Sequence, residues 1–276
     1  YTILSEDLLE LKKIFDGKSE FSKKLSLSKK PLFIIGESAL STKNGKFILE
    51  ETKNFLNKNN FINEKWNSFN VLLQNASSVG ALDLSFYNIN AENNFCFFDN
   101  LESNSFEFLY LLASDNLEVK KNNEFIVYQG SHGDRGAEIA DVILPSAAYT
   151  EQNGLYINIE GRIQECRKAS YPPGEAKEDW KIFNLLHKKI KNKNLFSDQT
   201  IIKNELIKKI PNFSEIGILP KKNIENIKSL NSEFMNESIK IQDLDYYYSN
   251  SIARSSKTMS DCRNIKNINK KNGTNN

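Results

Sequence analysis

Apolar residues recur with a helical period near the start of the chain and form compact runs further along it. From Ser5 to Phe15 they repeat every three or four residues up to Gly17, which predicts a short amphipathic helix. The segment from Lys29 to Gly36 contains a short apolar run between a proline and a glycine, and a helical pattern follows from Gly45 to Asn57. These patterns predict a strand, a turn and a helix, which together are half of a βαβ unit.

The middle of the chain continues this alternation. A helical face is predicted from Phe69 to Val79, ending near Gly80. Two apolar runs, Phe106 to Ala113 and Glu124 to Gln129, are short enough to be buried strands, and Ala140 to Pro145 predicts a further strand that ends at its proline. Alternating strands and helices of this kind predict a parallel α/β sheet with right-handed crossovers.

After Pro145 the pattern changes to a strict alternation of apolar and polar residues. The segments Leu155 to Glu160 and Arg162 to Arg167 alternate around Gly161, which predicts a β-hairpin. From Ala176 to Ile190 apolar residues return every three or four positions. This period predicts a helix whose apolar stripe faces a core.

Beyond Lys191 the chain is richer in lysine, asparagine and isoleucine and forms separate amphipathic segments. One is predicted from Asp198 to Ile210, stopped by Pro211, and another from about Lys222 to Met235. The last fourteen residues, Arg263 to Asn276, contain four basic side chains, two apolar ones and no acidic one. We therefore expect a disordered basic tail.

Composition and charge exclude several classes of protein. The 276 residues include 37 Lys and Arg against 35 Asp and Glu, a formal net charge of +2, which excludes a strongly cationic protein that coats nucleic acid. The apolar runs fall far short of the roughly 20 residues of a spanning helix, so we expect no direct membrane span. The chain has 36 Asn and 32 Lys but only 5 Arg. Such a bias is typical of AT-rich genes and favours an organellar gene.

Cysteine and histidine are scarce and scattered. The three cysteines, Cys96, Cys166 and Cys262, form no C-x-x-C pair, and the two histidines are His132 and His187. This distribution argues against a disulfide framework, a zinc ribbon, a ligated iron–sulfur cluster and a histidine-rich metal centre. We predict no metal-binding residue and no cofactor in this chain.

The densest group of glycine, histidine and charge is Gln129 to Glu138. Its three glycines follow a predicted strand and could cradle a phosphate, but the spacing G-x-x-G-x-x-G matches neither the dinucleotide fingerprint nor the P-loop. A tight structural loop is favoured. Ser131, His132 and Asp134 suggest a nucleophile with an acid–base pair, yet triads are assembled from distant segments, so hydrogen bonding within the loop is favoured here too.

The remaining candidate side chains have structural explanations of equal weight. His187 lies in a basic run on the predicted Ala176 to Ile190 helix, where a solvated helix end is favoured. Glu151, Glu160 and Arg162 flank the predicted hairpin. Paired carboxylates can act as general acid and base, but an ion-paired turn explains these residues as well. Residue types alone therefore indicate an α/β protein, and we predict no catalytic or cofactor-binding residue.

A long ordered series of motifs resembles a known family. The segments are Val127 to Ala137, Ile139 to Glu151, Asn158 to Arg162, Pro172 to Gly174 and Glu178 to Ile182. In this order they closely resemble the carboxyl-terminal half of the large iron–sulfur subunit of respiratory complex I, the proton-pumping NADH:ubiquinone oxidoreductase. The resemblance extends from near Tyr1 to about Cys262 through the segments Lys29 to Leu40, Ala76 to Phe86, Leu109 to Asp115 and Tyr246 to Cys262.

The resemblance implies a partial molybdopterin-oxidoreductase-like α/β fold with a parallel sheet, a β-hairpin and a helical carboxyl-terminal extension. We expect residues 1–190 to form the α/β domain, 191–262 the helical extension and 263–276 the tail. In molybdopterin oxidoreductases the block matching Ala140 to Arg162 helps to build a pterin-binding cleft. The complex I branch is understood to have kept this fold and lost the cofactor.

The resemblance also implies a function. We expect a structural, non-catalytic part of the peripheral arm of complex I, on the matrix side of the mitochondrial inner membrane, with other peripheral-arm subunits as partners and no nucleic acid. The cluster-bearing amino-terminal half of the subunit has no counterpart in these 276 residues. We therefore hypothesise a split gene, in which a separate chain supplies the iron–sulfur clusters.

Two alternatives belong to other classes of protein. The first is a fragment of a molybdopterin oxidoreductase that binds a pterin or nucleotide through the loop from Gly130 to Gly136 and Arg162. The second is a free α/β module that binds a nucleotide. Pterin fluorescence or measurable nucleotide affinity distinguishes these alternatives from a structural subunit.

Overall fold

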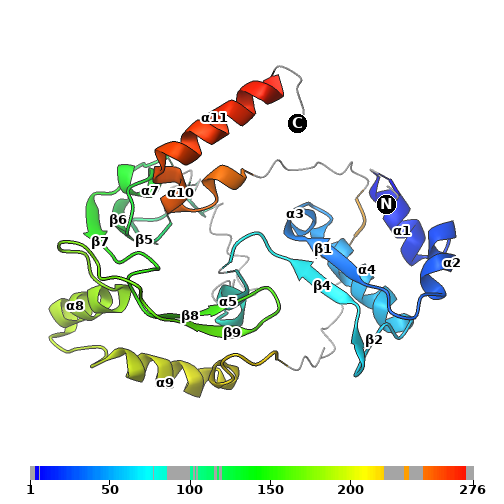
Figure 1. The fold of residues 1–276 in the computed structure, drawn as a ribbon, viewed down its shortest axis with the longest axis horizontal. Helices are drawn as coiled ribbons and strands as arrows, with labels where there is room; N and C mark the ends of the chain where they lie inside the picture. The colour runs from blue at the N-terminus through cyan, green and yellow to red at the C-terminus, as the bar shows by residue number, and fades with distance from the viewer. Residues whose placement is uncertain are drawn as a thin grey trace. The chain divides into compact units, whose positions relative to one another are not determined.

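The computed structural model divides into two compact units (Figure 1). The first unit comprises residues 1–79, 158–161 and 221–243, and the second comprises 80–157, 162–220 and 244–276. Within these units the structure describes residues 4–5, 7–76, 78–85, 100–101, 103, 105–114, 117, 120–220, 233–235 and 245–271. The expected α/β domain of residues 1–190 is thus divided between two units rather than forming one.

The first unit begins with two short helices. Helix α1 (Leu8–Phe15) is the predicted one and starts at Asp7, whose carboxylate accepts a hydrogen bond from the backbone N–H of Leu9. Helix α2 (Glu20–Ser26) was not predicted. It has too few apolar positions to show a period, and Ser22 is its only buried residue.

A βαβ unit forms the centre of the first unit. Strand β1 (Phe33–Gly36) pairs in parallel with β4 (Phe69–Leu72), and helices α3 (Glu37–Leu40) and α4 (Gly45–Lys58) connect them. The predicted strand and helix are confirmed. A short antiparallel pair, β2 (Ile62–Asn63) with β3 (Trp66–Asn67), precedes β4. The core lies between α4 and one face of the strands, where it contains Ile35, Phe47, Ile48, Phe55, Leu56 and Phe61.

One element of this unit differs from its prediction. The helical face expected from Phe69 to Val79 is wrong over its first half, which is strand β4, and helix α5 (Ser78–Asp83) begins only near its end. Spacings of three and one between apolar residues suit a helix, but they also suit a short strand whose two faces are both apolar. The parallel pairing with β1 decides between them, because it satisfies the backbone groups of Phe69 to Leu72.

The second unit contains a parallel sheet of three strands. Strands β5 (Phe108–Leu112), β6 (Phe125–Gly130) and β7 (Val142–Pro145) confirm the three strands predicted from their apolar runs, and they lie in the order β5-β6-β7. Helix α7 (Arg135–Glu138) lies in the connection from β6 to β7. One face of the sheet packs into a core made of Leu101, Leu109, Leu111, Ile126 and Tyr128.

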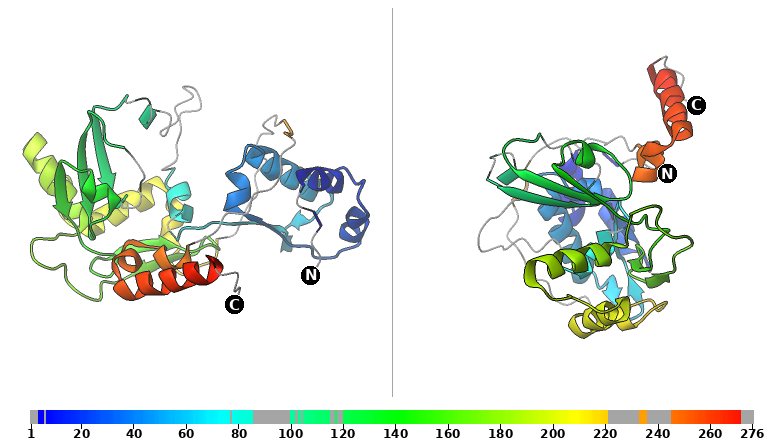
Figure 2. Two further views of the ribbon diagram at one scale, coloured as in Figure 1. Left: turned by 90° about the horizontal axis from the view of Figure 1, so that it is seen from above. Right: turned by 90° about the vertical axis from the view of Figure 1, so that its left-hand side faces the viewer.

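Helix α8 (Asp179–Lys191) packs on the other face of this sheet. The rings of Tyr110 on β5 and Phe183 on α8 lie 5.6 Å apart, and Figure 2 shows the helix alongside the three strands. The prediction that the apolar stripe of this helix faces a core holds only in part. Of the predicted stripe, Phe183 packs on Tyr110 but is still 36% exposed, and Ile190 is 74% exposed. The buried residue of the helix is Ile182, which lies outside that stripe.

The hairpin predicted around Gly161 and the helix predicted from Asp198 to Ile210 are both confirmed. Strands β8 (Gly154–Ile157) and β9 (Ile163–Cys166) pair antiparallel, and Gly161 in the turn adopts φ of 82°, which favours glycine. Helix α9 (Gln199–Lys209) begins after Asp198 and is followed by the 3₁₀ turn η1 (Pro211–Ser214). The hydrogen bond from the Gly217 N–H to the Ile163 carbonyl joins the segment after η1 to β9.

The carboxyl-terminal segment is helical. It contains η2 (Tyr246–Tyr248), α10 (Ser251–Ser255) and α11 (Lys257–Lys271), so the expected disordered tail is wrong for residues 263–271. Arg263 pairs with Asp245 at 2.5 Å and lies over the Tyr248 ring, which ties α11 to η2. Residues 272–276, and most of the helix predicted from Lys222 to Met235, lie outside the described residues. None of the described helices is long and apolar enough to cross a bilayer.

Candidate functional site

A ligand-binding site is expected at the carboxyl ends of β6 and β7, because open α/β sheets bind ligands outside the carboxyl ends of their strands. The loop from Gly130 to Asp134 leaves β6 at this edge, and the segment after Pro145 leaves β7 there. A cavity of about 320 Å³ lies between them. Its lining consists of Ser131, His132, Pro145, Ser146, Ala148, Glu151, Pro173, Glu175 and Ala176.

Two glycines of this loop, Gly130 and Gly136, leave space that the side chain of Tyr128 occupies. A Cβ at Gly130 would lie 2.2 Å from the Tyr128 hydroxyl, and one at Gly136 would lie 2.5 Å from the Ser114 carbonyl and 3.0 Å from the Tyr128 ring. Tyr128 is 2% exposed, and its hydroxyl donates a hydrogen bond to the His132 carbonyl at 2.8 Å. Gly130 and Gly136 therefore allow packing against Tyr128, which supports the structural loop that the sequence favoured.

The structure brings only two of the three loop candidates together. Ser131 Oγ lies 2.9 Å from His132 Nδ1. The Asp134 carboxylate instead accepts hydrogen bonds from the backbone N–H of Arg135 at 2.9 Å and from Arg254 Nε at 2.5 Å. Asp134 therefore caps α7 and holds the carboxyl-terminal segment. A Ser-His-Asp relay, which needs the carboxylate on the histidine, is not formed.

The other candidates serve local structure. Glu151 Oε2 accepts from the Ala148 N–H at 2.9 Å, and Arg162 Nη1 donates to the Gly217 carbonyl at 2.7 Å. The Glu160 N–H donates to Asn158 Oδ1 at 3.0 Å within the hairpin turn. His187 Nδ1 lies 2.6 Å from the Lys193 carbonyl, at the end of α8. Of these four side chains only Glu151 lines the cavity.

A buried polar network joins the sheet to α8, and sequence reasoning missed it. The fully buried Gln129 donates from Nε2 to Asp179 Oδ1 at 2.6 Å, and its Oε1 accepts from the Tyr110 hydroxyl. Gln152 donates to Asp179 Oδ2 at 2.8 Å and accepts from the Asp179 N–H at 3.2 Å. Burial, together with the charge of Asp179, raises the pKa of the Tyr110 hydroxyl. Together these hydrogen bonds hold β5, β6, the loop at Gln152 and the start of α8 against one another.

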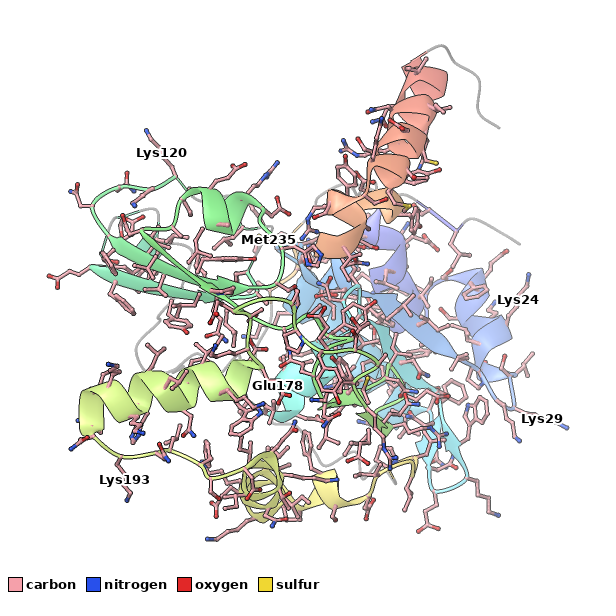
Figure 3. The ribbon with its side chains drawn as sticks, turned by 60° about the vertical axis from the view of Figure 1, so that its left-hand side comes forward. Lys24, Lys29, Lys120, Glu178, Lys193 and Met235 are labelled. Carbon is pink, nitrogen blue, oxygen red and sulfur yellow. The ribbon has the colours of Figure 1, made fainter. Side chains whose placement is uncertain are left out.

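Glu178, labelled in Figure 3, is a buried carboxylate immediately before α8. It accepts from Trp180 Nε1 at 2.7 Å and pairs with Lys168 at 3.1 Å and Lys181 at 3.5 Å. Burial alone would raise the pKa of Glu178, but the hydrogen bonds and the two lysine charges outweigh it and leave the pKa below its ordinary value. This carboxylate is held ionised as a structural anchor.

The described residues give no sign of a metal centre. Cys166 and Cys262 are free thiols, and Cys96 lies outside the described residues. Within the described ranges, no three of the side chains of His, Cys, Asp and Glu come together as a set of metal ligands.

Comparison with known proteins identifies the class to which this fold belongs. Residues 2–189 match the family model for molybdopterin oxidoreductase. This match covers more than half of the 276 residues, and the chain therefore belongs to the molybdopterin oxidoreductase family.

Particular relatives within that class cover nearly the whole chain. It is 38% identical to the NADH-ubiquinone oxidoreductase 75 kDa subunit of Reclinomonas americana, over 96% of this chain and 38% of that protein. It is 33% identical to the mitochondrial 78 kDa subunit of Neurospora crassa, over 94% of this chain and 35% of that protein. The mitochondrial 78 kDa subunit of Candida albicans is 35% identical, over 95% of this chain and 36% of its own length.

These matches confirm the resemblance predicted from the motifs. All three relatives are NADH-ubiquinone oxidoreductase subunits, and each aligns with this chain almost from end to end. The chain spans little more than a third of the length of each of them.

The family implies a molybdopterin cofactor, and the residues at the carboxyl edge of the sheet do not fit one. A pterin phosphate needs cations or free backbone N–H groups. The ionisable side chains that line the cavity are Glu151, Glu175 and His132, and the glycine loop is filled by Tyr128. Arg162, the other candidate for holding a pterin, donates to the Gly217 carbonyl and does not line this cavity.

Proposed function

We propose that the chain is a structural, non-catalytic part of the peripheral arm of respiratory complex I, supporting the iron–sulfur chain for NADH:ubiquinone oxidoreduction. The observation that carries the proposal is the similarity to NADH-ubiquinone oxidoreductase subunits over 94–96% of the chain. Electron transfer between clusters depends on fixed distances, so a rigid support contributes to it without carrying an electron.

The geometry supports a structural rather than a catalytic role. At the carboxyl edge of the sheet, Tyr128 uses the space that the glycines leave, and Asp134 is paired with Arg254. The partly buried carboxylate of Asp179 and the buried carboxylate of Glu178 hold the start of α8. In the described chain, each of these side chains has a structural partner and none is aimed into an open site. We infer that this chain carries no cofactor.

The partners in this proposal are other peripheral-arm subunits, above all the cluster-bearing part of the same subunit. In this proposal a separate polypeptide supplies that part. The assembly lies on the matrix side of the mitochondrial inner membrane, and the gene is organellar. A mitochondrial relative and the excess of Asn and Lys support this placement.

Isolation of the native complex tests the proposal. A tag on the full chain in its source organism should co-purify with NADH:ubiquinone oxidoreductase activity, and mass spectrometry should find a second chain rich in clustered cysteines. Absence of the chain from the active fractions would overturn the structural role. Peptides that bridge the chain and the cluster-bearing sequence in one polypeptide would overturn only the split gene.

A further inference from the structure

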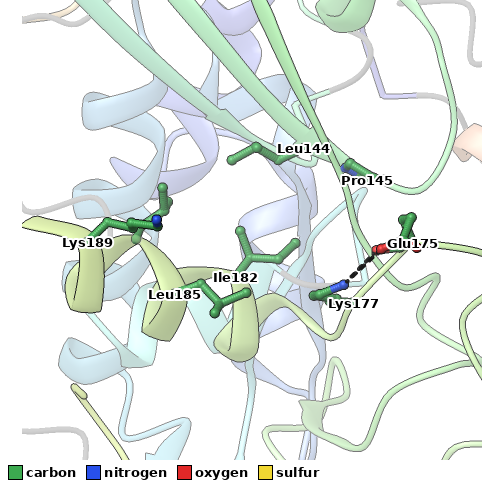
Figure 4. A pocket seen from close by; sticks show the side chains of 8 residues that line it. Leu144, Pro145, Glu175, Lys177, Ile182, Leu185 and Lys189 are labelled. Atoms are coloured by element: carbon green, nitrogen blue, oxygen red, sulfur yellow. Dashed lines mark hydrogen bonds and ion pairs between the residues drawn. The ribbon is translucent and has the colours of Figure 1, made fainter. Parts of the chain in front are cut away.

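An apolar groove separates strand β7 from helix α8 in the second unit. Leu144 and Pro145 form one wall, and Ile182, Leu185 and Leu186 of α8 form the other (Figure 4). The cavity has a volume of about 280 Å³, and Glu175, Lys177 and Lys189 complete its lining. This volume accommodates one or more apolar side chains from outside.

Leu185, one of the exposed apolar residues of α8, lies at the groove. Ile182 is 6% exposed and forms the floor, whereas Leu185 at the rim is 50% exposed. Apolar surface at the rim of an apolar cavity gains free energy when a partner covers it, because water leaves both surfaces together. The groove therefore favours an apolar occupant over a polar one.

The charges around Leu185 select the chemistry of that occupant. Lys181, Lys188 and Lys189 stand four residues before, three after and four after Leu185, which places them around it on the helix surface. Lys181 reaches Glu178 at 3.5 Å. For Lys188 and Lys189, the described part of the chain supplies no carboxylate partner.

The acidic residue that lines the groove is already engaged. Glu175 reaches Lys177 at 3.6 Å, and its side chain is 94% exposed. It lies with Lys177 on the loop before α8, while Lys189 lies in the last turn of the helix (Figure 4). The unpaired charge beside the groove is therefore positive, and a partner that brings carboxylates to Lys188 and Lys189 is favoured.

We propose that this groove is the docking site for a segment of another protein chain that inserts an apolar side chain beside Leu185 and places Asp or Glu next to Lys188 and Lys189. The identity of the assembly rests on the proposed function: the partner is another subunit of the same complex. A membrane surface also combines apolar and anionic groups, but it binds a protruding apolar face of a protein and does not fill a groove. The groove between β7 and α8 suits an inserted side chain.

Site-specific crosslinking in the assembled complex tests the proposal. A photoreactive amino acid replaces Leu185 in the tagged full chain, the complex is irradiated, and the linked peptides are identified by mass spectrometry. We expect links to one segment of another subunit that has an apolar residue within four positions of Asp or Glu. The same probe at Asn204, exposed on α9, should not give that peptide.

Other crosslinking results overturn the proposal. Links to lipid alone, to a second copy of this chain or to segments without carboxylates, or no links from a complex that still contains the chain, each contradict it and leave the proposed function standing. Failure of the chain to co-purify with the oxidoreductase overturns the proposed function instead.

A matched pair of charge variants tests the same contact independently. Lys189→Glu should lower the yield of the Leu185 crosslink about tenfold, because it places two carboxylates face to face. Lys193→Glu makes the same charge change two residues beyond α8, away from the groove lining, and should leave the yield within about twofold. Equal yields from the two variants would show that charge does not select the partner.

Discussion

Glu178 shows how a single carboxylate can anchor a helix. Its side chain is 7% exposed, accepts a hydrogen bond from Trp180 and forms ion pairs with Lys168 and Lys181. Its pKa in the folded state lies below the ordinary value, so folding favours the ionised form. The stabilisation is therefore complete above the ordinary carboxyl pKa and is lost as the pH falls through the lower pKa of the folded state.

We expect Glu178→Gln to lower the free energy of unfolding by about 1.5–3 kcal/mol at neutral pH, because it weakens hydrogen bonds to a charged group. Urea unfolding of the full chain at neutral and acidic pH measures the effect, which should shrink as wild-type Glu178 becomes protonated. Glu175→Gln, at a side chain that is 94% exposed, is the control and should change stability by less than about 0.5 kcal/mol. A loss of unfolding free energy in Glu178→Gln that is larger in acid than at neutral pH would contradict the role of Glu178 as an ionised anchor.

Gly130 allows a separate test, because the glycine loop contains its own control. Gly130→Ala should destabilise the chain by about 1–3 kcal/mol, since the new methyl group would meet the buried Tyr128 ring. Gly133→Ala should be nearly neutral, because nothing beyond its chain neighbours lies within 4 Å of the place that its methyl group would take. Thermal unfolding of the two variants decides the matter. Equal effects would show that Tyr128 does not require the glycine.

At the scale of elements, one ion pair links α10 to the loop after β6. Arg254 and Asp134 are 120 residues apart in sequence, and their side chains are 13% and 22% exposed. Arg254 also donates from Nη1 to the Tyr248 carbonyl at 3.1 Å. This pair therefore positions both η2 and α10, and with them the start of α11.

We expect Arg254→Ala to increase hydrogen exchange in α10 and α11 while leaving β5, β6 and β7 unchanged. A double-mutant cycle with Asp134→Ala should give a coupling energy of about 1–3 kcal/mol, because the two side chains are in contact. Additive effects of the two substitutions would mean that the pair contributes nothing. Lys257→Ala, an exposed substitution at the first residue of α11, serves as the control.

The elements also show where local pattern was sufficient. Strands β5, β6 and β7 and the hairpin were predicted because their apolar or alternating runs are short, and Gly130, Pro145 and Gly161 mark the ends of β6 and β7 and the turn of the hairpin. Strand β4 was misread because its spacing suits two structures, and only pairing with β1 chooses one. The part of α11 beyond Cys262 was missed because its order comes from contacts with η2, which its own composition does not show.

At the scale of the whole molecule, the proposed role makes a simple prediction about content. The isolated full chain should contain no stoichiometric iron or molybdenum, no visible absorption and no pterin fluorescence, because its carboxyl-edge cavity offers carboxylates where a pterin phosphate needs cations. Elemental analysis and fluorescence of the extracted protein test this. Stoichiometric metal or extractable pterin would overturn the proposed structural role.

The sequence alone determined the class of fold and the family, because these depend on the apolar period and on the order of motifs along the chain. Only the tertiary structure showed that Tyr128 needs the glycines, that Asp134 meets Arg254 and that Gln129 meets Asp179. Two of these contacts join residues that lie 120 and 50 positions apart in the sequence, and the third depends on how the buried Tyr128 ring is packed. Local propensity says nothing of them, because their free energy arises only when the chain brings the partners together and removes water from them.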